Sequence, residues 1–233
     1  MSPSRNFIKN LPVIGKISTK LYQLIRSNKF PGSKQYWEKR YSLGGHSGAG
    51  SYSALAEFKA EIINEFVKEK EIVSIIEFGS GDGNQLLLAE YPKYTGFDVS
   101  QTAIQLCSEK FKNDPSKKFQ IYDSLSFKSD GKYRADLTMS LDVIYHLIED
   151  EIFEKYMKHL FECSTRFVII YASNYDKVTA LHVRDRAFTS WIEKNIQGWD
   201  LLKKIKNKYQ YNPKDPDNTS PSDFFIYKKA GVV

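Results

Sequence analysis

The residues best placed to do chemistry lie in the stretch from Ile72 to Leu86, IVSIIEFGSGDGNQL. Its β-branched apolar run predicts a strand buried on both faces. Glu77 ends that strand, three glycines follow at alternate positions, and residues 85–89 predict a helix. The glycines are Gly79, Gly81 and Gly83. A turn of this kind brings bare backbone N–H groups and a helix N-terminus to a ligand. The alternative is a tight turn that binds nothing.

The spacing of the glycines differs from that of two common nucleotide-binding motifs. Dinucleotide folds use G-x-G-x-x-G, and the P-loop needs Gly-Lys-Ser/Thr, which is absent here. The pattern E-x-G-x-G-x-G resembles motif I of the class I S-adenosylmethionine-dependent methyltransferases. That resemblance implies that the turn, with Asp82 in it, passes under the amino-acid end of the cofactor. It also implies that Glu77 helps to hold the cofactor's ammonium group.

A second short strand begins at Tyr94 and ends at Asp98. Asp98 lies about 20 residues after Gly79. An acidic residue at this distance is expected to accept hydrogen bonds from the two hydroxyls of a ribose. The alternative is that Asp98 caps the helix that starts near Ser100. The glycine turn at the expected distance favours ribose binding.

The resemblance extends this cofactor site to further residues. A third strand, residues 118–123, ends in Asp123 and Ser124, which the family resemblance places at the adenine ring. An acid at a strand end also has a simpler explanation in turn chemistry. The resemblance adds Val99 and Leu141 to the cofactor site.

The segment after the fourth strand, D-V-I-Y-H-L, resembles motif IV of small-molecule methyltransferases. Asp142 and His146 are four residues apart, so on a helical turn they share a face. His146 is a candidate general base near neutral pH, with Asp142 as its catalytic partner. The alternative is that His146 only packs behind the site. Tyr145 is a candidate for binding the acceptor substrate.

A cluster of charged residues follows the fifth strand, residues 166–171. Ligands of open α/β sheets bind beyond the carboxyl ends of the strands. Arg184 and Arg186, with His182, are therefore candidates for binding a phosphate or carboxylate of the acceptor. A surface ion-pair cluster is an equally good interpretation. No clustered Cys or His predicts a metal site.

The N-terminal arm, residues 1–34, contains seven basic residues and no acid. Residues 7–26 predict a basic amphipathic helix that binds a membrane surface or a partner protein, or else packs on the body. Residues 44–50 are rich in glycine and predict a lid over the ligand, with a flexible connector as the alternative. W-E-K-R-Y with G-G-x-S-G-x-G-S-Y resembles a bacterial methyltransferase subgroup that often modifies surface glycans or small metabolites.

Composition restricts the possible partners. The net charge of +6 arises in the arm, since residues 35–233 keep 27 of the 34 basic residues against all 28 acidic ones. A near-neutral body disfavours a nucleic-acid surface. Two cysteines, no apolar run of about 18 residues and no secretory signal predict a cytoplasmic protein, with possible peripheral contact at the inner membrane face.

We therefore expect one class I methyltransferase domain, residues 35–233, preceded by the arm. Its fold is α/β, a Rossmann-like seven-stranded sheet, mostly parallel with an antiparallel last strand and helices on both faces. The resemblance implies methyl transfer from S-adenosylmethionine to a small-molecule or glycan acceptor, with a hydroxyl favoured and S-adenosylhomocysteine as by-product. The alternatives are an RNA methyltransferase, a nicotinamide oxidoreductase and a non-catalytic nucleotide-binding module.

Overall fold

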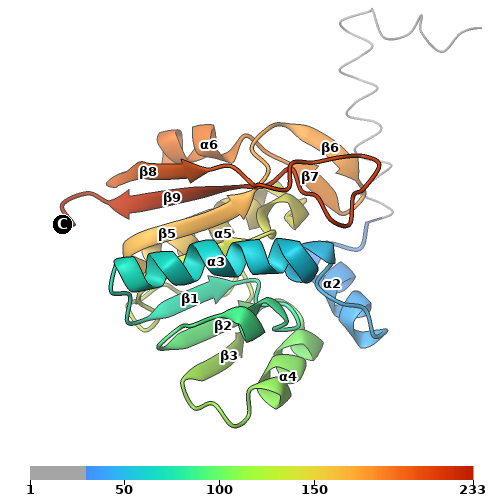
Figure 1. Ribbon diagram of the computed structural model, residues 1–233, viewed down its shortest axis with the longest axis horizontal. Helices are drawn as coiled ribbons and strands as arrows, with labels where there is room; N and C mark the ends of the chain where they lie inside the picture. The colour runs from blue at the N-terminus through green and yellow to red at the C-terminus, as the bar shows by residue number, and fades with distance from the viewer. Residues whose placement is uncertain (1–29, 233) are drawn as a thin grey trace, which may run out of the picture.

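A seven-stranded sheet runs through the molecule in the order β3-β2-β1-β4-β5-β9-β8 (Figure 1). This computed structural model describes residues 30–232. The strands are β1 (Ile75–Phe78), β2 (Tyr94–Asp98), β3 (Lys117–Ile121), β4 (Ala135–Leu141), β5 (Ser164–Ala172), β8 (Trp199–Ile205) and β9 (Asp223–Lys229). β9 runs antiparallel to both of its neighbours, β5 and β8, while the pairings from β3 to β5 are parallel. The predicted sheet, with its antiparallel last strand, is confirmed.

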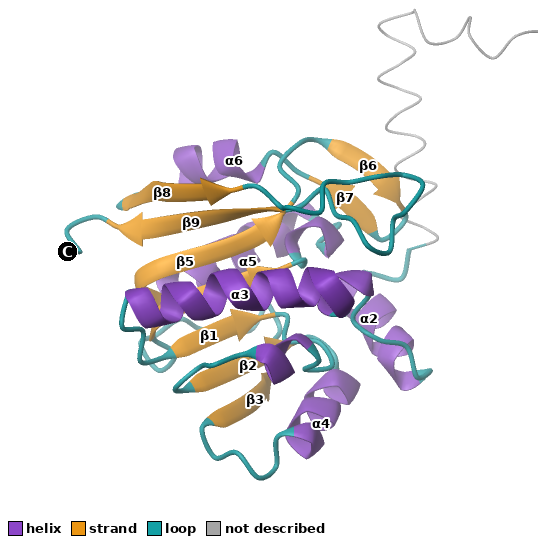
Figure 2. Cartoon of the chain, in the orientation of Figure 1, coloured by secondary structure: helices purple, strands orange, loops and turns teal. Residues whose placement is uncertain are grey.

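Helices cover both faces of this sheet (Figure 2). The helices are α2 (Ser33–Ser42), α3 (Ser53–Glu69), α4 (Gln101–Lys110), α5 (Asp150–Glu162) and α6 (Phe188–Asn195). Short 3₁₀ helices are η2 (Ala49–Ser51), η3 (Gln85–Leu88) and η4 (Ile144–His146). Helix α3 packs on one face of the sheet, and α5 and α6 pack on the other. The result is the three-layer arrangement expected of a mostly parallel sheet.

Strand β5 shows why the central strands carry continuous apolar runs. Successive residues of a strand point to opposite faces of a sheet. Phe167 and Ile169 therefore join the core beneath α3, whereas Val168 and Ile170 join the core beneath α5 and α6. Because both faces are covered, β5 cannot alternate apolar with polar residues as a half-exposed strand does.

Two features of this architecture differ from what the sequence led us to expect. The helix expected over residues 85–89 is only the short 3₁₀ helix η3, and Ala89 already has extended backbone angles. A two-stranded sheet of β6 (Lys177–Ala180) and β7 (Val183–Asp185) was not expected, and it lies where the arginine cluster was placed. Helix α2, whose first turn packs on the body through Ser33, runs across the predicted boundary between residues 34 and 35, and the division into arm and domain stays a prediction.

The basic amphipathic segment 7–26 lies outside the described residues. Within residues 30–232, none of the helices combines the length and apolar character that crossing a bilayer requires. In the same range, no group of three or more His, Cys, Asp or Glu side chains is arranged to hold a metal ion.

Candidate active site

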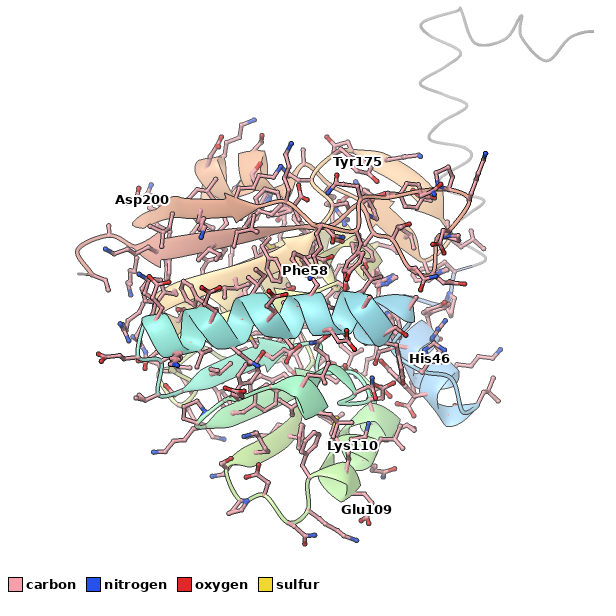
Figure 3. The ribbon with its side chains drawn as sticks, viewed as in Figure 1. His46, Phe58, Glu109, Lys110, Tyr175 and Asp200 are labelled. Carbon is pink, nitrogen blue, oxygen red and sulfur yellow. The ribbon has the colours of Figure 1, made fainter. Side chains whose placement is uncertain are left out.

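A cavity of about 300 Å³ opens at the carboxyl ends of β1, β2 and β4. His46, in the glycine-rich loop, lies at this end of the molecule, whereas Asp200 lies toward the other end (Figure 3). The lining includes most of the residues that the sequence singled out: Glu77, Gly79, Gly81, Asp82, Asp98, Val99, Asp123, Ser124, Leu141, Asp142 and His146. The predicted residues outside the lining are Gly83, Tyr145, His182, Arg184 and Arg186.

The glycine turn after β1 adopts a backbone that side chains disfavour. Gly79, Gly81 and Gly83 have φ angles of 90°, 56° and 72°, in the region where a Cβ atom clashes with the backbone. Space is also short, since a Cβ on Gly79 would lie 2.3 Å from Cγ2 of Val143. A Cβ on Gly81 would lie 2.3 Å from Oγ of Ser47. Both glycines therefore let neighbouring loops approach the turn.

The amides of this turn point into the protein, which corrects the expectation of bare N–H groups. The N–H groups of Gly79 and Ser80 donate to the Phe97 carbonyl, and that of Gly83 donates to the Ser80 carbonyl. The Gly81 amide donates to Asp98. Because η3 is a short 3₁₀ helix, the glycine turn does not lead into an α-helix N-terminus as expected. The polar character of the site comes from side chains instead.

Glu77 is the most enclosed acid of the cavity wall, with 5% of its surface exposed. The Tyr94 hydroxyl donates to its Oε2 at 2.7 Å. Burial penalises the charged form and raises the pKa of Glu77 to about 7, although the Tyr94 hydrogen bond and Lys59 act in the opposite direction. A cationic ligand beside Glu77 would stabilise the ionised carboxylate.

Asp98 joins the end of β2 to the glycine turn. Its Oδ2 accepts from the Gly81 amide and its Oδ1 from the Ser100 amide, both at 2.9 Å. Burial raises the pKa of Asp98 to about 6. The N-cap of α4 is Ser100, whose Oγ accepts from the Ala103 amide, so Asp98 is not the cap. A carboxylate oxygen can accept a second hydrogen bond, and ribose binding by Asp98 stays a prediction.

Helix α2 forms part of the cavity wall and is held there by polar contacts. Its Ser33 hydroxyl donates to Oε2 of Glu149 at 2.7 Å. Lys34 forms an ion pair with Asp123 at 2.9 Å between Nζ and Oδ2, and this bond lowers the pKa of Asp123. Farther along, Glu38 accepts from the hydroxyls of Ser100 and Thr102 at the start of α4. Contacts between such distant segments leave no periodic signal in the sequence.

The glycine-rich loop 44–50 rests on the glycine turn. The Ser47 amide donates to Oδ2 of Asp82, and the Asp82 amide donates back to Oγ of Ser47, both at 3.0 Å. The Tyr52 hydroxyl donates to the same carboxylate at 2.8 Å. These bonds place the predicted lid in contact with the site, and whether it moves stays a prediction.

Asp142 is held in a network of its own. Its φ angle of 59° lies in the left-handed region. Lys59 forms an ion pair with its Oδ2 at 2.8 Å, and the hydroxyls of Tyr145 and Ser222 donate to its Oδ1 at 3.0 and 3.1 Å. Lys59 was not predicted, although it interrupts the apolar stripe of α3 between Leu55 and Ile63. A lysine in that position is the signal that could have identified it.

No α-helical turn relates His146 to Asp142, contrary to expectation, although both residues line the cavity. Because Asp142 is left-handed and η4 is a 3₁₀ helix, the spacing of an α-helical turn does not apply, and no hydrogen bond joins these two described residues. Nδ1 of His146 donates to the His182 carbonyl at 2.9 Å, so Nε2 carries the lone pair. Burial lowers the pKa of His146 to about 4, so the ring is neutral and weakly basic at pH 7.

The arginine cluster contacts the protein itself. Arg184 pairs with Asp150 at 2.8 Å and donates to the Ile148 carbonyl. Buried Arg186 donates to the carbonyls of Leu147 and Ile148 and pairs with Asp150. These donors fix the loop between η4 and α5, and neither arginine lines the cavity. The geometry matches the ion-pair interpretation rather than acceptor binding.

Comparisons with known proteins give a match in structure but none in sequence. No family model matches the chain, and no curated protein sequence does so significantly. The N-methyltransferase NodS from Bradyrhizobium japonicum WM9, solved with S-adenosyl-L-homocysteine, superposes with a TM-score of 0.62 at 13% identity, over 85% of this chain and 98% of that one.

Two further structures superpose similarly. The methyltransferase domain of a bacterial Hen1 matches with a TM-score of 0.57 at 17% identity, over 75% of this chain and 98% of that one. The magnesium protoporphyrin IX methyltransferase ChlM from Synechocystis PCC 6803, with bound SAH, gives 0.56 at 12% identity, over 75% and 83%. The chain therefore has the class I methyltransferase fold.

Proposed function

We propose that this protein is an S-adenosylmethionine-dependent methyltransferase that acts on a small-molecule or glycan acceptor, most readily at a hydroxyl group. One observation carries the proposal. The glycine turn and the buried acids Glu77 and Asp98 border a single cavity of about 300 Å³ at the strand ends of a methyltransferase fold. In open α/β sheets this edge is where ligands bind.

The cavity wall fits such a cofactor in its hydrogen-bonding chemistry. The buried Oε1 of Gln85 lacks a hydrogen-bond partner among the described residues, and it belongs to a residue of the lining. A buried acceptor of this kind calls for a ligand with donors. The cofactor has an ammonium group for Glu77 and ribose hydroxyls for Asp98, and we assign its adenine to Asp123 and Ser124, which belong to the same lining. When bound, the cofactor supplies an electrophilic methyl group.

The lining favours a small uncharged or cationic acceptor over RNA. Six carboxylates face the cavity against two lysines and the neutral His146. The carboxylates are Glu77, Asp82, Asp98, Asp123, Asp142 and Glu149, and the lysines are Lys34 and Lys59. Binding a phosphate backbone needs a basic surface, which a body with 27 basic and 28 acidic residues does not offer.

The acceptor side of the cavity is aromatic. The Trp37 ring meets His146 edge-on, with 4.9 Å between the ring centres. Aromatic walls with a few polar groups are typical of small-molecule sites. His146 would accept the hydroxyl proton at Nε2, and Asp142 would hold Tyr145 in place. Since His146 is a weak base, we attribute most of the rate enhancement to placement of the acceptor.

Isothermal titration with S-adenosylhomocysteine tests the proposal. We expect saturable micromolar binding by the wild-type protein, a large loss in Asp98→Ala, and no binding of NADH. Asp200→Ala is the matched control, because it removes an exposed carboxylate toward the opposite end of the molecule (Figure 3). NADH binding would favour an oxidoreductase. Absence of both would favour a module that binds neither.

Binding alone does not distinguish an enzyme from a cofactor-binding module. Incubation with methyl-labelled cofactor and a panel of sugars, phenols and amines separates them, with RNA as a further arm. Methylation of a small hydroxyl compound supports the proposal. Transfer only to RNA, weakened by salt, would establish the alternative acceptor.

A further inference from the structure

A fully buried lysine forms part of the cavity wall. Lys59 of α3 has 1% of its surface exposed and lines the cavity beside Glu77 and Asp142. Burying an ammonium group costs several kcal/mol unless it is paired and hydrogen-bonded. A buried lysine is therefore expected to have a partner for its charge. The question is whether Asp142 alone satisfies the ammonium group of Lys59.

Asp142 accepts one hydrogen bond from the Lys59 ammonium group. The distance from Nζ to Oδ2 is 2.8 Å, and Nζ lies 5.3 Å from the centre of the Tyr171 ring. An ammonium group has three N–H donors. In the described part of the chain, the Asp142 carboxylate is the hydrogen-bond acceptor that Lys59 contacts. Donors therefore remain on a group that faces the cavity.

Two acceptors lie in the same wall. Glu77 has one hydrogen-bond donor among the described residues, the Tyr94 hydroxyl. The Oε1 of Gln85 has none, although its Nε2 donates to the Ala56 carbonyl at 3.0 Å. Ala56 lies three residues before Lys59, so α3 positions both side chains. The charge of Lys59 acts on Glu77, whose pKa it lowers.

We infer that Lys59, Gln85 and Glu77 together bind the α-amino-acid end of the cofactor. Lys59 binds the carboxylate, while Gln85 Oε1 joins Glu77 at the ammonium group. This inference rests on the proposed function. A zwitterion suits this recess because it brings one charge of each sign to a lysine and an acid that are both desolvated.

The other lysine of the lining is less suited to the carboxylate. Lys34 has a side chain that is 59% exposed, and it pairs with Asp123 after the end of β3. That position belongs to the side of the cavity where we expect the adenine. Lys59 is the buried cation of the described lining, and buried charge–charge contacts are weakened less by water and salt.

Binding of three ligands tests the inference. They are S-adenosylhomocysteine, its decarboxylated analogue S-adenosyl-3-thiopropylamine, and 5′-methylthioadenosine, which lacks both charged groups. The main variant is K59M/D142N, which removes both partners of the ion pair so that no buried charge is left alone. Lys117→Met is the matched control, because Lys117 is also largely buried but binds the Tyr91 carbonyl away from the cavity.

We expect K59M/D142N to bind S-adenosylhomocysteine about 10- to 100-fold more weakly, the range of a charge-assisted hydrogen bond. The other two ligands should change by less than about twofold, within ordinary scatter between variants. Gln85→Met should weaken binding of both amine-containing ligands and spare 5′-methylthioadenosine. Lys117→Met should behave as wild type.

The outcomes that overturn the inference are distinct from failure of the proposed function. Equal loss of all three ligands in K59M/D142N would show a structural role for Lys59, and unchanged binding of S-adenosylhomocysteine would show no role. A wild-type protein that binds the decarboxylated analogue as tightly as S-adenosylhomocysteine would refute carboxylate recognition and leave the cofactor intact. A wild-type protein that binds none of the three would refute the proposed function, and this inference with it.

Discussion

Replacing Glu77 by glutamine should stabilise the protein at alkaline pH. The side chain is buried and nearly the same size in both cases, and the Tyr94 hydroxyl can donate to an amide oxygen as it does to Oε2 of Glu77. The substitution therefore removes a buried charge while keeping the hydrogen bond. Its effect on the free energy of unfolding depends on how much the charge costs.

That cost follows from the pKa of Glu77, about 7 in the folded protein against 4.5 for an ordinary glutamate. The folded state retains a proton that the unfolded state has lost between these values, so Glu77 makes stability fall as pH rises through this window. Each unit of pKa difference corresponds to 1.36 kcal/mol. Relative to the unfolded state, the raised pKa of Glu77 thus costs about 1 kcal/mol at pH 5, where the folded side chain is protonated, and about 3 kcal/mol at pH 8, where it is ionised.

Urea unfolding of wild type and Glu77→Gln at both pH values measures this difference. We expect the variant to gain about 3 kcal/mol at pH 8, or about 6–12 °C in Tm for a chain of this size, and about 1 kcal/mol at pH 5. Wild type and variant are compared at each pH because two other groups with shifted pKa values also make the free energy of unfolding depend on pH. Asp98, with a raised pKa, acts in the same direction as Glu77, and His146, with a lowered pKa, acts in the opposite direction.

A variant less stable than wild type at pH 8 would refute the reasoning, as would an equal gain at both pH values. The same variant should bind S-adenosylhomocysteine more weakly, because it offers the ammonium group no charge. Gain of stability with loss of affinity is the pattern of a site that keeps a costly charge for binding.

Three further predictions address other parts of the site. Asp142→Ala leaves Lys59 buried without its partner and should lower the free energy of unfolding by about 3–5 kcal/mol, whereas Glu109→Ala, which breaks the exposed pair with Lys112, should leave urea unfolding unchanged. Gly79→Ala should destabilise well beyond Gly131→Ala, which we expect to cost about 1–2 kcal/mol; both glycines have a φ of 90°, but only at Gly79 would the Cβ meet Val143. The His146 ring should show no titration by NMR from pH 8 to 5.5, and a midpoint near 6.5 would contradict its burial.

The sequence predicted the elements that depend on local pattern. The apolar runs of β1, β4 and β5 are buried on both faces, and the glycines at 79, 81 and 83 all adopt positive φ. The prediction of a helix after Gly83 was wrong. Leu87 and Leu88 are exposed, so this segment has no buried apolar stripe that would stabilise a helix longer than η3. Leucine favours helices, but helix stability in proteins comes mainly from packing.

The candidate site was predictable only in part, since most of its contacts join distant segments. Ser47 binds Asp82, and Lys34 binds Asp123, at separations of 35 and 89 residues. Such pairs have no fixed spacing. The arginine cluster follows β5, at the end of the sheet where ligands bind, which is why the sequence indicated a binding role. Its donors instead bind a carbonyl of the loop before α5, and the sequence does not indicate the path of that loop.

The position of β9 in the sheet affects how the chain folds during its synthesis. Strand β9 follows all other strands in sequence, yet it lies between β5 and β8. Until β9 is synthesised, β5 has an open edge and β8 has no neighbour in the sheet. Buried residues Phe224 and Tyr227 are then also missing from the two cores. A nascent chain therefore presents an unpaired apolar strand edge, the feature most prone to pairing with other chains. We expect folding to be completed late in synthesis and to benefit from chaperones that shield that edge.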